Sequence, residues 1–205
     1  MTTKELTKAI LAISARIDEN KDYLVSLDQQ NGDGDLGISM SDGFHAVLQY
    51  LNDNQETDLG KVLNRCGNAF NEAAPSSLGT IIAFAFKGMA KALMGKTECN
   101  LENLSEAMQL GLENVMSKAG SKPGEKTILD SLSPGIEALK ASSGDPSTAF
   151  VLAADAARDG SENTKKMKAV WGRAAYYGDK SIGTLDGGSV VGVLIFEALR
   201  DIKSN

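Results

Sequence analysis

The sequence has 205 residues, with 21 Lys and Arg against 27 Asp and Glu, which gives a formal net charge of −6. A compact domain typically contains about 100–200 residues, so we expect one domain over residues 1–205. An acidic chain with scattered Lys and Arg lacks the positive surface that nucleic acid requires, which excludes that class of partner. The single histidine, His45, and the absence of a CxxC spacing between Cys66 and Cys99 exclude a typical zinc site.

No membrane partner is expected from the hydropathy pattern. The longest apolar runs, 78–86 and 187–196, are shorter than the ~18 residues that a membrane span needs. Lys4, Glu5 and Lys8 interrupt what would be the apolar core of a secretion signal. Two isolated cysteines without such a signal fit a reducing compartment, so the expected location is the cytoplasm.

Apolar residues recur at helical spacing along nearly the whole chain. In residues 4–25, Leu6, Ile10, Ile13 and Ile17 share one face. The other predicted helices cover residues 39–52, 58–73, 79–94, 101–118, 126–141, 147–168 (in one piece or two) and 187–203. Glycine and proline mark the breaks between them, at Gly32 to Gly37, Pro75, Gly95, Pro123-Gly124, Gly144 to Pro146 and Gly183 to Gly188. The pattern predicts an all-α fold of about eight helices.

Two of these helices, 79–94 and 187–199, are apolar around most of their circumference, as the central helices of a bundle are. Both begin in loops rich in Gly or Ser. Their positive N-terminal ends are therefore open to an anion.

An acidic loop between the first two predicted helices is the most informative segment. Glycines bracket Asp33 and Asp35, so the backbone can turn sharply, and Asp28 lies at the end of the preceding helix. Three carboxylates this close repel one another unless a cation lies among them. Oxygen ligands on a flexible loop suit Mg²⁺ or Ca²⁺, and three carboxylates leave about half of an octahedral Mg²⁺ shell open for water and phosphate.

Two other interpretations of this loop are weighed against a metal site. An EF-hand needs Glu at its twelfth position, where counting from Asp28 or Asp33 gives Ser39 or Phe44, and that interpretation fails. A solvated acidic turn that only reverses the chain stays open, because Gly-Asp-Gly turns are common.

Two further segments have the composition of phosphate-binding loops. Residues 73–80 form a small-residue loop that opens a helix, although Ser76 or Ser77 taken alone indicates an ordinary helix N-cap. Residues 171–188 form a long loop, and loops of that length in compact domains are usually functional. Arg173 in this loop offers the planar fork that suits phosphate, with a plain surface arginine as the alternative. His45, Cys66 and Cys99 are assigned no chemical role.

Together these segments resemble the nucleotide-binding subunit of dihydroxyacetone kinase of the phosphotransferase-system-dependent kind. The resemblance extends over nearly the whole chain in the same order. It rests on Leu27-Asp28 with Gly32-Asp33-Gly34-Asp35-x-Gly37, on Pro123-Gly124-Glu125-Lys126-Thr127 with Asp130, and on Gly172-Arg173-Ala174-x-Tyr176-x-Gly178-x-x-Ser181-Ile182-Gly183 with Asp186 and Gly188.

This resemblance implies a barrel of eight antiparallel amphipathic helices with nucleotide and two Mg²⁺ ions at one end. It implies that Asp28, Asp33 and Asp35 are metal ligands and, with Arg173, the catalytic residues. The implied ADP/ATP-binding residues are Leu36, Gly37, Ile38, Ser39, Ser76, Ser77, Ala119, Ile128, Arg173, Asp186, Gly187 and Gly188.

The resemblance also implies a phosphoryl relay. Bound ADP is rephosphorylated in place by a histidine-bearing phosphocarrier subunit and passes the phosphoryl group to dihydroxyacetone, which a separate substrate-binding subunit holds. Such transfer depends on positioning and charge neutralisation rather than on a protein nucleophile. A homodimer stays open as an assembly.

The chain departs from the family pattern around the nucleotide while the three aspartates are kept. Leu36 and Thr184 stand where relatives usually have His, Ser39 stands for Asn, and Gly187 stands for Pro. The 74–80 loop is also shortened. A second hypothesis is therefore a catalytically altered relative that serves as a binding or regulatory partner of a kinase subunit.

Overall fold

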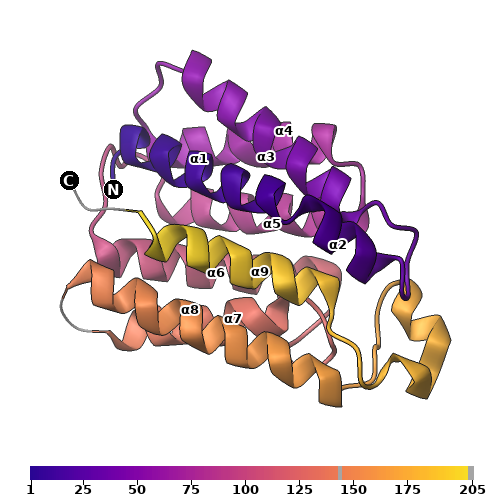
Figure 1. The fold of residues 1–205 in the computed structure, drawn as a ribbon. Helices are drawn as coiled ribbons and strands as arrows, with labels where there is room; N and C mark the ends of the chain where they lie inside the picture. The colour runs from indigo at the N-terminus through magenta and orange to yellow at the C-terminus, as the bar shows by residue number, and fades with distance from the viewer. Residues whose placement is uncertain (143–144, 203–205) are drawn as a thin grey trace. The chain divides into compact units, whose positions relative to one another are not determined.

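The computed structural model describes residues 1–142 and 145–202, and helices make up its regular structure (Figure 1). In chain order the elements are α1 (Thr3–Glu19), α2 (Lys21–Asp28), α3 (Leu36–Asp53), α4 (Leu59–Ala73), α5 (Ser77–Ala92), α6 (Leu101–Ala119), α7 (Leu129–Ala141), α8 (Pro146–Asn163), the 3₁₀ turns η1 (Thr164–Lys166) and η2 (Arg173–Ser181), and α9 (Gly187–Arg200). Among the described residues, strand-like pairing is limited to one bridge between Thr2 and Glu98. The all-α prediction is confirmed.

The chain folds into two compact units. Unit 1 consists of Met1–Ala15 and Ser39–Gly120, and unit 2 consists of Arg16–Ile38 and Ser121–Asn205. The prediction of a single domain stays a prediction, and each unit is described by itself.

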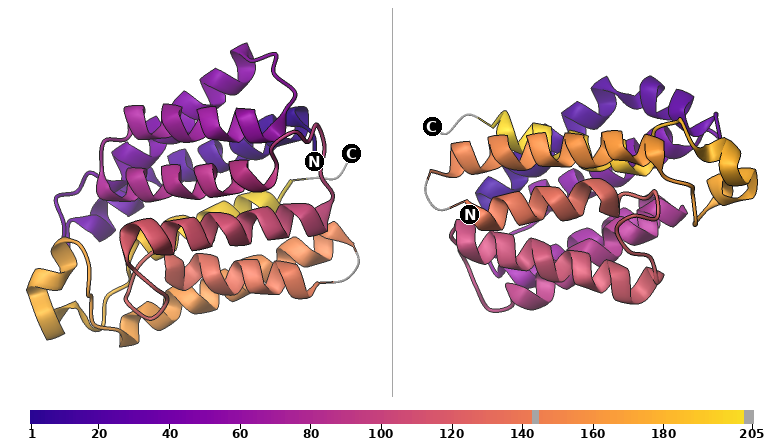
Figure 2. Two further views of the ribbon diagram at one scale, coloured as in Figure 1. Left: turned by 180° about the vertical axis from the view of Figure 1, so that it is seen from behind. Right: turned by 90° about the horizontal axis from the view of Figure 1, so that it is seen from below.

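Unit 1 is held together by an aromatic cluster between helices that lie side by side. Helix α5 packs between α4 and α6 (Figure 2). The Phe44 and Phe70 rings meet edge to face with centroids 5.0 Å apart, and Phe70 lies 6.3 Å from Phe86. Because Phe44 and Phe70 are almost fully buried, this contact anchors α3 and α4. The apolar 79–94 helix is central within its unit, as its composition predicts.

Unit 2 is built around α9, which packs against α7, α8 and α2. Its side chains Val191 and Phe196 are fully buried, together with Leu139 of α7 and the small residues Ala153 and Ala157 of α8. Small residues on α8 allow the helices to approach closely. The second apolar helix of the sequence is therefore also central in its own unit.

Several helix boundaries differ from the sequence prediction. The helix expected over residues 4–25 is two helices, which makes nine α-helices in the described residues, because the Asn20 side chain bonds Arg16 O and interrupts the ladder. The helix expected from residue 126 begins at Leu129. The 147–168 helix ends at Asn163 and continues as η1. The predicted break at Gly144 and the predicted helix end at Lys203 lie outside the described residues.

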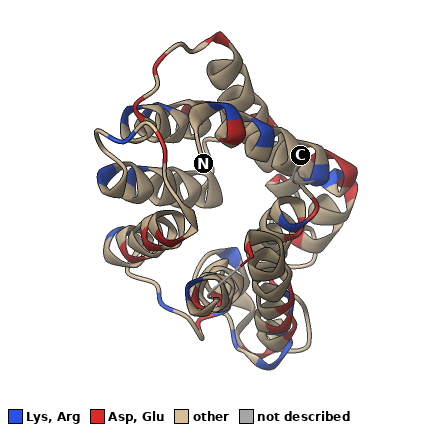
Figure 3. Cartoon of the chain, turned by 90° about the vertical axis from the view of Figure 1, so that its left-hand side faces the viewer, with Lys and Arg blue, Asp and Glu red and all other residues tan. Residues whose placement is uncertain are grey.

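The charged residues are spread over many helices. In Figure 3, Lys and Arg alternate with Asp and Glu along the helices instead of gathering on one element. Within the described ranges, no helix combines the length and hydrophobicity needed to cross a membrane.

Candidate functional site

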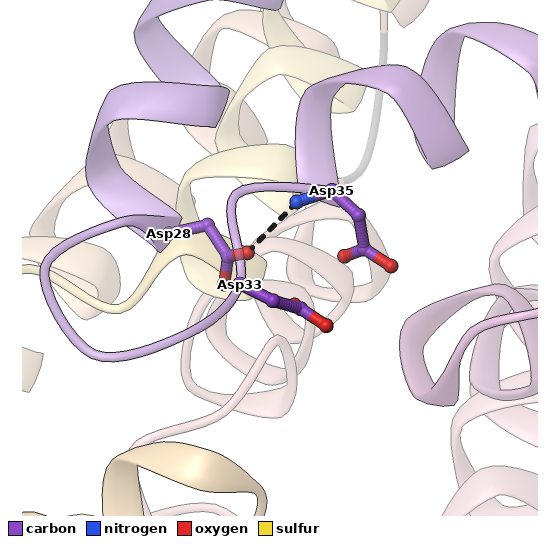
Figure 4. Close-up of side chains that lie close together, drawn as sticks. All are labelled: Asp28, Asp33 and Asp35. Carbon is purple, nitrogen blue, oxygen red and sulfur yellow. Dashed lines mark hydrogen bonds between the residues drawn. The ribbon is translucent and has the colours of Figure 1, made fainter.

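The three predicted aspartates lie together in unit 2, where α2 ends and α3 begins. Asp28 is the last residue of α2, and Asp33 and Asp35 follow in the turn before Leu36 (Figure 4). One carboxylate oxygen from each residue lies within 4.8 Å of the others. Asp28 is half-buried at the end of α2, and Asp33 and Asp35 are exposed, so the cluster is open to solvent.

Asp28 also organises the loop that carries its two neighbours. Its Oδ2 accepts hydrogen bonds from Gly34 N at 2.7 Å and from Asp35 N at 3.2 Å. A Cβ on Gly32 would overlap the Asp28 carboxylate, with the carboxyl carbon only 2.7 Å away. The glycines therefore let the loop close over Asp28, as the sequence pattern predicts.

The electrostatics of the cluster fit a hard cation. The pKa of Asp35 is raised by burial and then by the negative charges of Asp33 and Asp28, while Arg173 opposes the rise. The Arg173 guanidinium lies 2.6 Å from Asp33, in an exposed ion pair. The donors are all carboxylate oxygens that repel one another, which is the donor set that Mg²⁺ prefers.

Residues 164–186, termed the Arg173 segment, place this arginine beside the aspartates. The loop expected over residues 171–188 is partly regular, because η2 winds residues Arg173–Ser181 into 3₁₀ turns broken at Gly178. An open pocket of about 600 Å³ lies between it and the acidic loop, lined by Asn31, Gly32, Arg173, Tyr176 and Tyr177. The sequence interpretation gave no role to Asn31 or the two tyrosines, although Tyr176 belongs to the motif around Arg173.

The N-terminus of α9 brings together another predicted group. Asp186 caps the helix by accepting from Ser189 N at 2.6 Å, and burial raises its pKa to about 7. The Asp130 and Asp28 charges add to the rise, while the Ser189 bond and the Lys126 charge oppose it. A Cβ on Gly188 would lie 3.4 Å from Ile128 N, so Ile128 adjoins the first turn of α9.

Two departures from the family pattern are in contact. A Cβ on Gly187 would lie 2.6 Å from Cδ2 of Leu36, which is itself buried. The Leu36 side chain therefore occupies the space that a side chain at residue 187 would need. Leu36 at the start of α3 and Gly187 at the start of α9 belong to one local packing arrangement.

The remaining predicted residues belong to unit 1, apart from Gly37 and Ile38 in the first turn of α3. Ser76 caps α5, since its Oγ accepts from Gly79 N at 3.0 Å, which confirms the N-cap interpretation of that loop. Ser76 Oγ also lies 2.7 Å from Ser39 Oγ, whereas Ser77 is exposed. Ala119 is the last residue of α6.

The cysteines have the inert character expected from the sequence. Cys66 and Cys99 are free thiols in buried positions. Burial raises the pKa of the Cys66 thiol to about 12, so it stays protonated at neutral pH.

Comparison with known proteins adds a family to this geometry. The model of the DAK2 domain matches residues 30–201. The PEP-dependent dihydroxyacetone kinase 1, ADP-binding subunit DhaL, of Listeria innocua is 33% identical, over 90% of this chain and 88% of the relative. The corresponding ADP-binding subunit of Escherichia coli is 30% identical, over 87% and 86% of the two chains.

A solved structure shares the fold. The dihydroxyacetone kinase from C. freundii, in complex with AMP-PNP and Mg²⁺, has a TM-score of 0.76 and 22% identity over 95% of this chain. The present chain spans 33% of that kinase chain. This likeness supports the all-helical architecture.

Proposed function

Because the chain belongs to the DAK2 domain family, we propose that it is the ADP- and Mg²⁺-binding subunit of a dihydroxyacetone-type kinase. The observation that carries the proposal is the convergence of the Asp28, Asp33 and Asp35 carboxylates within 4.8 Å of one another, with Arg173 at their edge. A surface turn that only reverses the chain has no need of three mutually repelling carboxylates and a pocket beside them.

In this proposal the three aspartates hold two Mg²⁺ ions, which when bound neutralise the charge of the nucleotide phosphates. Asp28 fixes the loop through its bonds to Gly34 N and Asp35 N. Arg173 lies close enough to Asp33 to move from that carboxylate onto a transferring phosphoryl group. Phosphoryl transfer then depends on positioning and charge neutralisation, which these side chains supply.

The nucleotide-binding residues form the second part of the proposal. In unit 2 they are Leu36, Gly37, Ile38, Ile128, Arg173, Asp186, Gly187 and Gly188. In unit 1 they are Ser39, Ser76, Ser77 and Ala119, among which the Ser39–Ser76 bond fixes two hydroxyls as a pair. The free N–H groups at the start of α9 suit a phosphate oxygen.

The partners follow from the same reaction. A substrate-binding kinase subunit holds the ketose, and a histidine-bearing phosphocarrier subunit regenerates ATP from bound ADP. The proposed setting is the cytoplasm, because the two buried thiols are unpaired.

Native mass spectrometry and thermal unfolding test the proposal. The gently purified protein should carry one adenine nucleotide, and ADP with Mg²⁺ should raise the melting temperature, since a ligand at ~100 times its Kd stabilises by about 2.7 kcal/mol. ADP with EDTA should give a much smaller shift. Asp33→Asn should weaken nucleotide binding without destabilising the nucleotide-free protein, because it also removes a repulsive charge.

Two outcomes would overturn this function. The metal role is wrong if tight ADP binding survives in the double variant Asp28→Asn, Asp33→Asn. Absence of both bound nucleotide and thermal shift in the wild type would favour the second candidate, a regulatory relative. That candidate is supported by Leu36, whose apolar side chain fills the space beside Gly187.

A further inference from the structure

The Arg173 segment is closed at its base by bonds between its two ends. Gly183 N donates to Lys165 O at 2.7 Å, and Asp186 N donates to Thr164 Oγ1 at 3.1 Å. Residues 164–165 at the start of the segment therefore lie beside residues 183–186 at its end, and this meeting point is termed the neck. The direction in which the segment projects is set at this neck.

One buried ammonium group joins both sides of the neck. Lys126 Nζ donates to Thr164 O at 2.7 Å and to Thr184 O at 2.6 Å. Thr164 lies at the start of the Arg173 segment and Thr184 lies near its end. Lys126 is only 4% exposed. An ammonium so far from water is expensive unless its donors are satisfied, so the bonds to these two carbonyls are the reason that it can be buried.

The backbone at Lys126 is strained to make this contact. Its φ is +61°, and it is the non-glycine residue with positive φ in the described part of the chain. A β-carbon in this conformation crowds the neighbouring carbonyl, a cost that glycine would avoid. The strain is tolerated because Asp130 fixes the turn on either side, accepting from Gly124 N and from Thr127 N. Strained residues of this kind cluster at functional sites.

The neighbouring residue ties down the middle of the same segment. The Glu125 carboxylate accepts from Trp171 Nε1 at 2.6 Å, and Glu125 O accepts from Val170 N. Two consecutive residues therefore hold the segment at its neck and just before Arg173. Burial lowers the pKa of Lys126, but the Asp186 and Asp130 charges oppose this and help to keep the ammonium charged.

We propose that Lys126 is a positioning residue, which aims Arg173 at the aspartate cluster by clamping the two ends of the Arg173 segment. The effect of this role on ADP binding rests on the proposed function. The clamp itself consists of bonds within the protein and does not depend on nucleotide. Without the ammonium, Thr184 O loses this donor and Thr164 O keeps only its bond from Met167 N, so nothing ties the two carbonyls together and the neck opens. Arg173, about ten residues from either end, then loses its fixed position beside Asp33.

Lys126→Met tests the proposal, with Lys122→Met as the matched control. Methionine keeps most of the length of the side chain and removes the charge, and Lys122 is an exposed lysine in the same turn. Trp171 is the single tryptophan of the chain and lies inside the segment, so its fluorescence reports on the segment directly. The readouts are acrylamide quenching of Trp171 without nucleotide, far-UV circular dichroism, and affinity for ADP with Mg²⁺.

Lys126→Met should make Trp171 clearly more accessible to acrylamide while helix content is kept. ADP affinity should fall roughly 10–100-fold, as when a residue that orients a ligand-binding group is lost. Lys122→Met should match the wild type in all three measurements. Unchanged quenching in Lys126→Met overturns the clamp, whatever happens to ADP.

The test also gives an answer if the variant does not fold or if the wild type binds no ADP. If Lys126→Met does not fold, hydrogen exchange on the wild type replaces it: the Gly183 and Asp186 amides should be protected like helix amides, and rapid exchange at both overturns the clamp. If the wild type binds no ADP, the proposed function fails, while the quenching result still decides the clamp.

Discussion

Single residues decide the geometry of the acidic cluster, and Gly32 is the most exacting of them. The Asp28 carboxylate lies where a Cβ at residue 32 would be. We expect Gly32→Ala to displace Asp28 and to lower Mg²⁺-dependent ADP affinity by about 10–100-fold, as measured by calorimetric titration. The melting temperature without nucleotide should change little, because the loop lies outside the helical core. Gln30→Ala, an exposed change in the same loop, is the control, and wild-type affinity in Gly32→Ala would contradict the geometry.

Asp186 gives the site a pH dependence whose sign is fixed by burial. Its pKa is raised to about 7 in the folded protein from an ordinary value of 3.8, so the folded state binds the proton more tightly than the unfolded state. The stability associated with this proton is complete below about pH 4 and is lost as pH rises through about 7. In Asp186→Asn the side chain keeps an oxygen that can cap α9, and it stays neutral at every pH in this range.

We therefore expect Asp186→Asn to match the wild type near pH 4.5 and to be more stable at pH 8, by about 1–2 kcal/mol. Urea unfolding in EDTA at both pH values measures this difference. A stability difference that does not vary with pH would show that Asp186 is ionised in both states.

The aspartate cluster was predictable because its cause is local: glycines on both sides of Asp33 and Asp35 allow a tight turn beside Asp28. Lys126 was not predictable as a clamp. Its turn has the composition of an ordinary helix start, and its partners, the carbonyls of Thr164 and Thr184, lie 38 and 58 residues away. Carbonyl acceptors belong to every residue, so no side-chain pattern marks them.

At the scale of elements, the starts of α3 and α9 are coupled through Leu36 and Gly187. Proline at residue 187 suits the first position of a helix, and Asp186 already has the extended backbone that precedes proline (φ −82°, ψ 124°). Taken alone, Gly187→Pro should raise the free energy of unfolding by about 0.4–1 kcal/mol, because proline lowers the conformational entropy of the unfolded chain. Its Cβ would, however, lie 2.6 Å from Leu36 Cδ2.

A double-mutant cycle measures that coupling. Gly187→Pro should be less favourable in the wild type than in the Leu36→Ala background, by about 1 kcal/mol or more, because only the wild type has the overlap. Urea unfolding of the four proteins gives the coupling energy. Additive effects would mean that Leu36 moves aside freely and that the two departures are independent.

Helix positions followed from apolar periodicity, since burial of one face is a property of the sequence itself. Helix ends did not, because capping and turn contacts decide them. The break after Glu19 depends on one amide bond from Asn20 to Arg16 O. The late start of α7 depends on Asp130, which draws Gly124 N and Thr127 N into a turn.

At the scale of the whole molecule, the open question is whether the two units unfold together. The chain passes between them at residues 15/16, 38/39 and 120/121, and the first two passages fall within α1 and α3. Interrupting a helix at such a passage sacrifices backbone hydrogen bonds on both sides. The single-domain prediction therefore leads us to expect one cooperative transition.

The position of Trp171 makes this expectation testable with one substitution. Trp171 lies in unit 2, whereas Phe70 lies in the aromatic cluster of unit 1. Phe70→Leu should lower the free energy of unfolding by about 1–3 kcal/mol through lost packing.

If the molecule unfolds as one domain, urea curves from Trp171 fluorescence and from circular dichroism should shift together. Leu11→Ala, at a 54% exposed position of unit 1, should move neither curve appreciably. A Trp171 curve that stays in place while the dichroism curve splits would show that the units unfold as separate domains.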